Sequence, residues 1–381
     1  METVRNQSKR KTAGNILLIA GCVVQTIALW NEYAWYEACA KYTTLFSLVI
    51  LVACGLLIVP AKKAIRDPWF WAAFAAAAVA AINIYLTGSG KGAFLTAADV
   101  LIVAYLADKT ELTRIGMLFM FVYTGFFFYY WTFDVKGYFK GYNTNYGGLV
   151  LICGFVFAIT GLIAWRCELK EKEPSGAIFL TGFILFMFVW GYNIIAWYRA
   201  RCALLGFVVF AILLVIPAKV WKNKVFHTLL TLATTLGAIA VSLLYVWIGK
   251  SASFNVQVFY KDIISGREAI WSDLWGAYIQ HPLTGIGSSY HINLDWMGGM
   301  FEVHNGLLDI LIVHGLLVFA VTIVMLIHRL LALREKAENP VSKSAQAAVF
   351  AILAASFMEN FVIVPPFLLL FLVLIAIARS A

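Results

Sequence analysis

The chain has 381 residues, of which 62% are hydrophobic and only 13% are charged. Soluble domains are roughly 45–50% apolar and about 25% charged, so this composition excludes an ordinary soluble domain and predicts a membrane protein. The formal net charge of +9 fits an excess of Lys and Arg beside anionic lipid headgroups, and it gives no reason to expect a nucleic-acid partner.

Windows of about 20 apolar residues predict transmembrane helices along the whole chain. Twelve spans are expected, near residues 14–30, 42–59, 69–87, 93–107, 115–133, 146–165, 176–197, 202–218, 226–248, 307–327, 346–364 and 366–378. The fourth and the twelfth are the shortest. We therefore expect an all-α polytopic bundle in which residues 1–381 form a single integral membrane domain.

The distribution of basic residues predicts the orientation of this bundle. Lys and Arg near the ends of spans stay preferentially on the cytoplasmic side. If the N-terminus lies inside, most of the 29 basic residues fall on inner segments, so both termini are predicted to be cytoplasmic. The one long connection, residues 249–305, then lies outside, and connections of this length are uncommon unless they are functional.

Two features argue against nucleotide and metal chemistry. GSGKG, residues 88–92, echoes a phosphate-binding loop but lacks the GxxxxGK[ST] spacing and follows an apolar span. The six cysteines form no CxxC pair and show no ligand spacing with histidines. We predict neither a cofactor nor a metal site.

Basic residues also occur in connections that the topology places outside, against the positive-inside pattern. Lys136 and Lys140 lie in the connection DVKGYFKGYNTNYG, and Arg199 and Arg201 lie in WYRARCALLG between the seventh and eighth spans. Cations retained on the unfavoured side indicate an anionic ligand there.

Within residues 249–305, the sequence SGRE predicts a capping box that opens a helix, and His281-Pro282 predicts its end. At 100° per residue, Arg267 falls at the centre of the apolar face. That face carries Trp271, Leu274 and Tyr278, and the opposite side carries Ser272, Asp273 and Gln280. Arg267 could bind a lipid phosphate at the membrane surface or the phosphate of a substrate, and the helix pattern alone leaves both open.

Asn305 is a suitable N-cap for the tenth span, so His304 precedes the positive end of that helix. This position favours the neutral imidazole, which can accept a proton. A lone histidine at a membrane surface is more often passive, so a role for His304 depends on its neighbours.

Three carboxylates, Asp99, Asp309 and Glu359, are expected inside spans, toward their outer ends. Acids within a membrane are candidates for function, although each could equally be a paired or neutral structural residue. Their similar depth predicts a polar cavity that opens outward.

An outward cationic cavity with a neutral histidine and no nucleotide site limits the chemistry. Because nucleotide-activated donors are cytoplasmic, a transfer reaction outside needs a donor that is already activated and anchored in the membrane. A polyprenyl diphosphate-linked sugar meets this need, since arginines can stabilise its departing diphosphate and its tail can lie against apolar spans.

Three sequence motifs follow one another between residues 199 and 320. They are RARCALLG, SGREAIWSDLWGAYIQHPLTGIG and HNGLLDILIVHGLL. In this order they resemble the O-antigen ligase and O-antigen polymerase superfamily, bacterial glycosyltransferases of the C type. GYNTNYGGL, residues 141–149, resembles the Asn-rich element that commonly precedes them.

The resemblance implies roles for several residues. Arg201 and Arg267 would hold and stabilise the donor diphosphate, and His304 would be the base that deprotonates the acceptor hydroxyl or would orient that hydroxyl. Substrate-binding residues would be Arg199, Lys136, Lys140, Asn305, Asp309 and Glu359. The family commonly has Ser before the first arginine, whereas Ala200 stands there in this chain. We favour Arg201 over Arg199 because CALLG follows it, as the family pattern expects.

The expected enzyme is thus metal-independent and lies in the bacterial cytoplasmic (inner) membrane, with its active site outside. Its partners would be an undecaprenyl diphosphate-linked glycan, an acceptor that is a glycan, lipid or protein, and membrane lipids. Polymerisation, ligation and protein glycosylation share this chemistry, and the short outer connection slightly favours a polymerase. The alternative is a lipid-linked oligosaccharide flippase or anion transporter, which predicts broken helices and polar residues at the membrane midplane.

Overall fold

In the computed structural model of this protein, the described residues are 2–30, 42–130, 144–250, 257–258, 261–262, 266–295 and 302–381. These ranges contain sixteen α-helices, one 3-10 helix and a short antiparallel ribbon of β1 (Gln257–Val258) and β2 (Lys261–Asp262). The predicted all-α fold is confirmed.

The contacts of the chain divide it into two compact units, each made of several segments. The first comprises residues 1–109, 232–329 and 356–369, and the second comprises residues 110–231, 330–355 and 370–381. The prediction that residues 1–381 act as one membrane domain stays a prediction.

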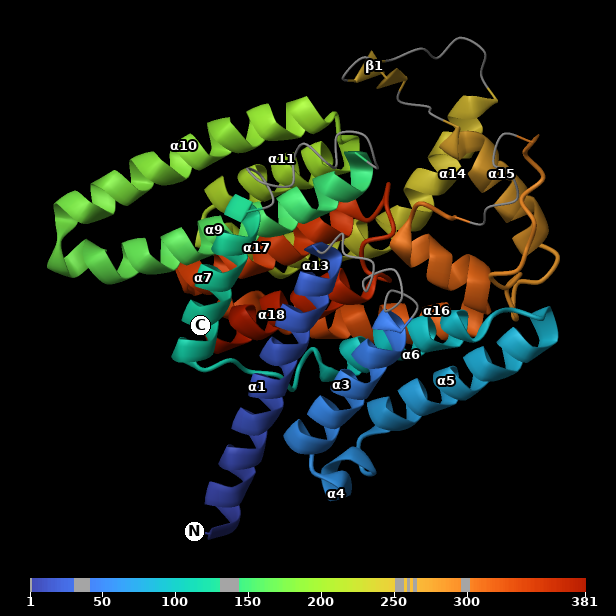
Figure 1. The fold of residues 1–381 in the computed structure, drawn as a ribbon, viewed down its shortest axis with the longest axis horizontal. Helices are drawn as coiled ribbons and strands as arrows, with labels where there is room; N and C mark the ends of the chain where they lie inside the picture. Colours follow the sequence, from blue (N-terminus) through green and yellow to red (C-terminus); the bar gives the residue numbers. More distant parts are fainter. Residues whose placement is uncertain are drawn as a thin grey trace. The chain divides into compact units, whose positions relative to one another are not determined.

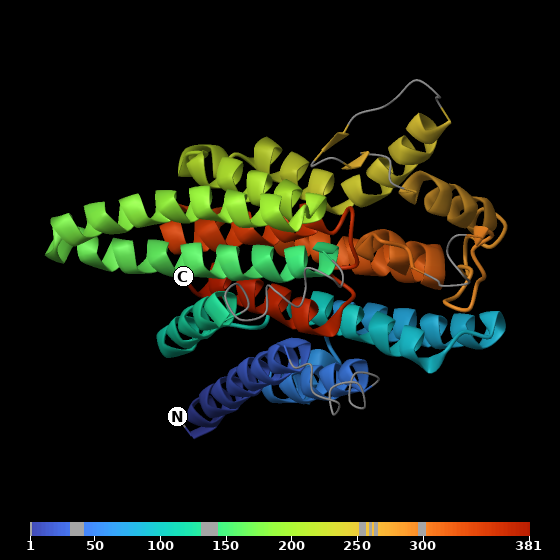
Figure 2. The ribbon, with the colours of Figure 1, turned by 45° about the horizontal axis from the view of Figure 1, so that its top comes forward.

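Helices of the first unit pack in neighbouring pairs. They are α1 (Glu2–Trp30), α3 (Thr43–Ile58), α4 (Ala61–Ala64), α5 (Pro68–Thr87), α6 (Lys91–Leu106), α14 (Gly237–Gly249), α15 (Arg267–Tyr278) and α16 (Gly306–Leu331). α1 packs on α3, α6 packs on both α3 and α5, and α14 packs on α15. Figures 1 and 2 both show α5 and α6 side by side.

The second unit is built around α9. It contains α7 (Arg114–Tyr130), α9 (Thr144–Lys172), α10 (Pro174–Tyr198), α11 (Arg201–Val215), α12 (Ala218–Trp221), the 3-10 helix η3 (Arg334–Glu338) and α17 (Pro340–Ala355). α9 contacts α7, α10, α11 and α17, and α9 and α10 form the long green hairpin of Figure 2. Two further helices, α13 (Lys224–Thr235) and α18 (Pro365–Ser380), contribute residues to both units.

Among the described residues, four helices are long and apolar enough to cross a membrane: α5, residues 147–172 of α9, α10 and α16. The pair α13 and α14, bent by 55°, makes a fifth if it is counted as one broken span. A helix occurs at each of the twelve predicted stretches, but several are only 16 or 17 residues long, such as α3 and α7. The protein is a multi-pass helical membrane protein, and the number twelve stays a prediction.

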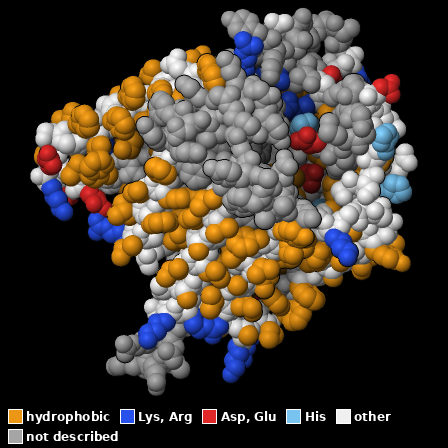
Figure 3. All heavy atoms as spheres, viewed as in Figure 1, with side chains coloured by type: hydrophobic (Ala, Val, Ile, Leu, Met, Phe, Trp, Pro, Cys, Tyr) orange, Lys and Arg blue, Asp and Glu red, His pale blue; other side chains and the backbone are white. Residues whose placement is uncertain are grey.

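Hydrophobic side chains cover the outer faces of the candidate spans. On α5 the exposed side chains include Trp71, Phe74, Ile82, Tyr85 and Leu86, and Figure 3 shows hydrophobic groups over the corresponding region. Soluble monomers rarely expose contiguous apolar patches of this kind. Contact with lipid accounts for them.

The structure corrects two of the predicted spans. The span predicted at 226–248 is broken at Leu236, between α13 and α14. The span predicted at 346–364 ends at Ala355, and residues 356–364 are a non-helical connection. Pro365 and Pro366 start the next helix, and the residue before a proline is disfavoured in helical conformation. Glu359 therefore lies in a connection and not inside a span.

The most specific packing in the first unit joins HPLTGIG, residues 281–287, to a break in α16. Gly315 interrupts that helix with φ 83° and ψ 174°. Ile286 N donates to Ile312 O at 2.8 Å, and Leu316 N donates to Pro282 O at 2.8 Å. Inside a membrane protein, an interrupted helix is tolerated when its released backbone groups find such partners.

Neighbouring contacts complete this junction. Gly287 N donates to Val313 O at 3.2 Å, and Asn83 Nδ2 of α5 donates to His314 O at 2.8 Å. Ser288 N donates at 2.9 Å to the hydroxyl of Ser89, within the GSGKG stretch. That stretch therefore packs against the loop.

Gly315→Ala should prevent normal folding of the first unit. Gly315 has φ +83°, and an added Cβ would overlap Leu283 O and lie 2.8 Å from Gly285 N. We expect a large loss of monodisperse protein in detergent and a lowered melting temperature. Gly182→Ala in α10 is the control, since an added Cβ there meets nothing within 4 Å. A Gly315→Ala protein that purifies and melts like the wild type would contradict this account of the junction.

Candidate functional site

Four ionisable side chains of the first unit gather where α15 begins and α16 begins. Arg267 Nη2 donates to Glu359 Oε1 at 2.5 Å. His304 Nδ1 lies 3.3 Å from Glu302 Oε1 and 3.6 Å from Glu359 Oε2. We call these four residues the Arg–His cluster. The structure brings together three of the predicted site residues, Arg267, His304 and Glu359, and adds Glu302.

Arg267 is the first residue of α15 and projects from its buried face. It is 8% exposed, and Ile270, Trp271, Leu274 and Tyr278 on the same face are buried as well. The predicted apolar face is confirmed. The capping box is wrong, because the helix begins one residue later, after Gly266 with φ 88°.

The Arg267–Glu359 pair is buried, with side chains 10% and 6% exposed. Removing one partner of such a pair leaves an uncompensated charge and typically costs about 3–5 kcal/mol, whereas the pair as a whole contributes little to stability. A buried guanidinium held by a carboxylate is therefore weak evidence for stability.

Residues 303–305 hold His304 at the start of α16. Asn305 is the N-cap, as predicted, because its Oδ1 accepts from Leu308 N at 3.0 Å. Its Nδ2 donates to Ala238 O at 3.0 Å, and Trp271 Nε1 of α15 donates to Val303 O at 2.7 Å. The Asn305 side chain is thus occupied within the protein, which makes it a residue that positions His304 more than a substrate ligand.

His304 has a left-handed backbone conformation, with φ 55°. Histidine tolerates this region better than most residues, but non-glycine residues adopt it rarely and at a cost of order 1–3 kcal/mol. The turn directs the imidazole toward the carboxylates of Glu302 and Glu359. These two acids stabilise an imidazolium, the species that forms when the ring accepts a proton.

Glu302, His304 and Glu359 each offer one potential metal ligand, and these atoms lie within 4.8 Å of one another. A divalent cation at this position would bring a second positive charge beside the guanidinium of Arg267, which already binds Glu359. Of the three, Glu359 already accepts a hydrogen bond from Arg267, so it would have to be shared between the guanidinium and a metal ion. Metal independence stays a prediction.

The remaining predicted carboxylates of the first unit lie in helices. Asp309 is in the first turn of α16, as expected. Asp99 lies in the middle of α6 and is buried. Lys136 and Lys140 fall outside the described residues.

Arg199 and Arg201 belong to the second unit, where they flank the junction of α10 and α11. Arg199 is the left-handed C-cap of α10, with φ 56°, and Arg201 is the first residue of α11. A cation at a helix N-terminus is electrostatically unfavourable unless an anion is bound nearby.

The junction of α10 and α11 packs against the Asn-rich element. Ala200 is fully buried, and a Cβ added to Gly148 would overlap its side chain. Cys202 Sγ lies 3.8 Å from Asn145 O. A small residue is needed at position 200, which explains how Ala can stand where the superfamily commonly has Ser.

Sequence reasoning missed Glu302 and Asn360. Glu302 stands two residues before His304, a spacing that places side chains on the same side of an extended segment, so its proximity could have been anticipated. Asn360 Oδ1 accepts from Asn305 N at 3.0 Å. No local signal marks Asn360, because it meets Asn305 only through the fold.

These observations define a multi-pass helical membrane protein with a cluster of a buried arginine, a buried carboxylate, a partly exposed histidine and a second, partly exposed carboxylate. Residues 174–323 match the model of the family described as O-Antigen ligase, so this part of the chain is an O-antigen ligase domain. The match extends from α10 into α16 and includes Arg199, Arg201, Arg267, Glu302 and His304. Comparison with curated proteins and with solved structures found no match.

Proposed function

We propose that the protein is a glycosyltransferase that moves a glycan from a polyprenyl diphosphate-linked donor to an acceptor hydroxyl outside the bacterial cytoplasmic membrane. The observation that supports this best is the Arg–His cluster, in which a buried arginine and a histidine share the carboxylate of Glu359. The cluster combines an anion-binding group with a proton acceptor, as a substitution at an anomeric carbon requires.

In this proposal the acceptor hydroxyl gives its proton to His304 as its oxygen bonds to the anomeric carbon of the donor. The bond between that carbon and the diphosphate oxygen breaks, and the diphosphate leaves with the electron pair. Glu302 and Glu359 stabilise the imidazolium formed, and Arg267 neutralises the negative charge that develops on the leaving group. A guanidinium has five N–H donors, so pairing with a carboxylate does not preclude binding a phosphate.

The proposal also assigns Arg201, with Arg199 and the lysines 136 and 140, to the anionic donor, and Asp309 to substrate binding. These assignments rest on the family resemblance and on the cationic character of the segments. The acceptor is a hydroxyl of a glycan, a lipid or a protein. We expect no cofactor.

A second candidate is a flippase or anion transporter, because broken helices, such as those at Gly315 and Leu236, are common in transporters. At Gly315, however, backbone groups are satisfied by Ile286, Gly287 and Asn83. The break thus serves packing within the protein, which favours the transferase.

The decisive experiment reconstitutes the protein in liposomes with the polyprenyl diphosphate-linked glycan of its own host and with candidate acceptors. A glycosylated acceptor together with released polyprenyl diphosphate supports the proposal. Glycan that crosses the membrane without forming a new glycosidic bond supports the transporter. Neither product under conditions in which the protein stays folded would reject both.

The proposed orientation predicts that His291, which is exposed, faces outward in the twelve-span topology with cytoplasmic termini. In a variant whose Cys39 and Cys167 are replaced by Ser, His291→Cys should react with a membrane-impermeant maleimide in intact spheroplasts. Lys62→Cys is the matched inner position, also exposed, and should react only after lysis. The reverse pattern would invert the topology and place the cluster on the cytoplasmic side.

A further inference from the structure

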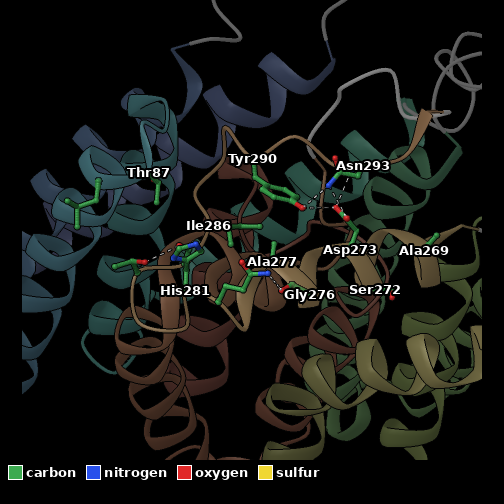
Figure 4. Close-up of a pocket in the computed structure, with 14 residues that line it drawn as sticks. Thr87, Ala269, Ser272, Asp273, Gly276, Ala277, His281, Ile286, Tyr290 and Asn293 are labelled. Carbon is green, nitrogen blue, oxygen red and sulfur yellow. Dashed lines mark hydrogen bonds between the residues drawn. The ribbon is translucent and has the colours of Figure 1, made fainter.

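A hollow of the first unit lies on the face of α15 that points away from Arg267. Its volume is about 980 Å³, at the upper end of the roughly 300–1,000 Å³ typical of ligand pockets. α15, the end of α5 and residues 280–293 line it. Figure 4 shows Asp273, Tyr290 and Asn293 pointing toward one another, with Thr87 of α5 on the opposite side. We call this hollow the α15 pocket.

A hydrogen-bonded network forms one wall of the α15 pocket. Tyr290 donates its hydroxyl to Asp273 Oδ2 at 3.1 Å, and Asn293 Nδ2 lies 3.4 Å from Asp273 Oδ1 and 3.3 Å from the Tyr290 oxygen. Burial, together with the neighbouring carboxylate of Asp273, raises the pKa of Tyr290, so its hydroxyl stays protonated. The network holds a carboxylate, an amide and an aromatic ring in fixed relative positions.

The lining differs from that of a pocket for an apolar ligand. Eight of its fourteen residues carry polar side chains: Thr87, Ser272, Asp273, Gln280, His281, Thr284, Tyr290 and Asn293. It includes one carboxylate and no lysine or arginine. Hydroxyl and amide groups both donate and accept hydrogen bonds, so this wall matches a ligand rich in hydroxyl groups. The carboxylate, without a cation beside it, disfavours an anionic ligand.

α15 itself connects the α15 pocket with the Arg–His cluster. At 100° per residue, five residues of the pocket lie within about 60° of the direction opposite to Arg267. They are Ala269, Ser272, Asp273, Gly276 and Gln280. The two sites therefore lie on opposite faces of α15. The helix between them has a diameter of about 10–12 Å, side chains included. A ligand in the pocket lies away from the reacting bond and contributes binding energy at a distance from it.

We propose that the α15 pocket binds uncharged sugar residues of the glycan, away from the bond that reacts, and that it selects against glycans rich in uronic acid. This inference rests on the proposed function for the origin of the glycan. It goes beyond that function by assigning the recognition of the sugar to Asp273, Gln280, Tyr290 and Asn293.

The test measures binding separately from transfer. The probe is the host's own glycan released from its polyprenyl carrier by mild acid, titrated calorimetrically into the protein in nanodiscs. We expect the double variant Tyr290→Phe/Asn293→Ala and the single variant Gln280→Ala each to weaken binding at least 10-fold. Arg267→Lys should leave binding of this carrier-free glycan within about 2-fold of the wild type. A uronate oligosaccharide should not bind.

His291→Ala is the matched control, because His291 is exposed in the same segment and does not line the pocket. Gln280, just after α15, makes one long side-chain hydrogen bond, to Gly276 O at 3.5 Å. Its replacement therefore keeps the test valid if the double variant fails to fold. In the transfer assay, a raised KM for the donor or for the acceptor identifies which glycan occupies the pocket.

Two outcomes separate this inference from the proposed function. If transfer occurs but Gln280→Ala and the double variant bind the glycan like the wild type, the pocket assignment is wrong and the transferase stands. If the glycan binds and the variants lose it while no transfer is found, the pocket is a glycan site and the transferase proposal fails. Absence of glycan binding to the wild type overturns the inference.

Discussion

His304→Ala should lower the rate of glycan transfer by about 10²–10⁴-fold, the usual contribution of a positioned general base. The variant removes the imidazole but leaves the backbone hydrogen bonds of residues 303–305 in place. We therefore expect normal abundance and a melting temperature that is only slightly lowered, because Ala adopts the left-handed conformation of residue 304 less readily than His. The measurement is kcat in the reconstituted transfer assay, with donor and acceptor both saturating.

The control for this variant is His291→Ala. His291 is exposed and lies outside both the α15 pocket and the Arg–His cluster, so its loss should leave kcat near the wild-type value. Full activity of the His304→Ala protein would remove His304 from the reaction. The carboxylates of Glu302 and Glu359 would then need another explanation.

Arg267→Lys should lower kcat/KM by at least about 10²-fold, because a point charge cannot reproduce the planar fork that a guanidinium presents to a diphosphate. The positive charge is kept, so the carboxylate of Glu359 is not left unpaired and the protein should still fold. The measurement is initial transfer rates at varied donor concentration.

Glu359→Gln is the companion variant, since it leaves Arg267 buried without its carboxylate. Removing one partner of a pair as buried as this one typically lowers the free energy of unfolding by about 3–5 kcal/mol. This variant should therefore lose both stability and transfer. Arg267→Lys with near-normal turnover would indicate that the arginine anchors lipid phosphate and takes no part in catalysis. The helix pattern of residues 267–278 fits this alternative, lipid-phosphate binding, as well as it fits substrate binding.

Local patterns predicted much of the first unit correctly. The amphipathic period of residues 267–278 placed Arg267 among buried aromatic and aliphatic side chains, and the residue type at Asn305 predicted an N-cap. Both depend on neighbours within one or two helical turns. The same is true of the helix start at Gly306 and, in the second unit, of the helix start at Arg201.

Features that depend on distant segments were not predictable in this way. Hydropathy windows joined residues 346–364 into one span, because an apolar average does not register the turn before Pro365. The contact of Glu359 with Arg267 joins residues 92 positions apart. The left-handed turn at His304 likewise depends on Trp271, Ala238 and Asn360 holding its neighbours.

The backbone hydrogen bonds between residues 281–287 and the interrupted helix α16 also affect how the protein moves. A surface loop ordinarily opens on its own, with a free energy far below that of the whole fold. Here the amides of Ile286 and Gly287 are bonded to carbonyls of α16. This stretch can detach only when the helix beside it loses its own backbone partners. The connection is therefore as rigid as the helix that it contacts. α15, which carries the Arg–His cluster on one face and the α15 pocket on the other, is held in a fixed position.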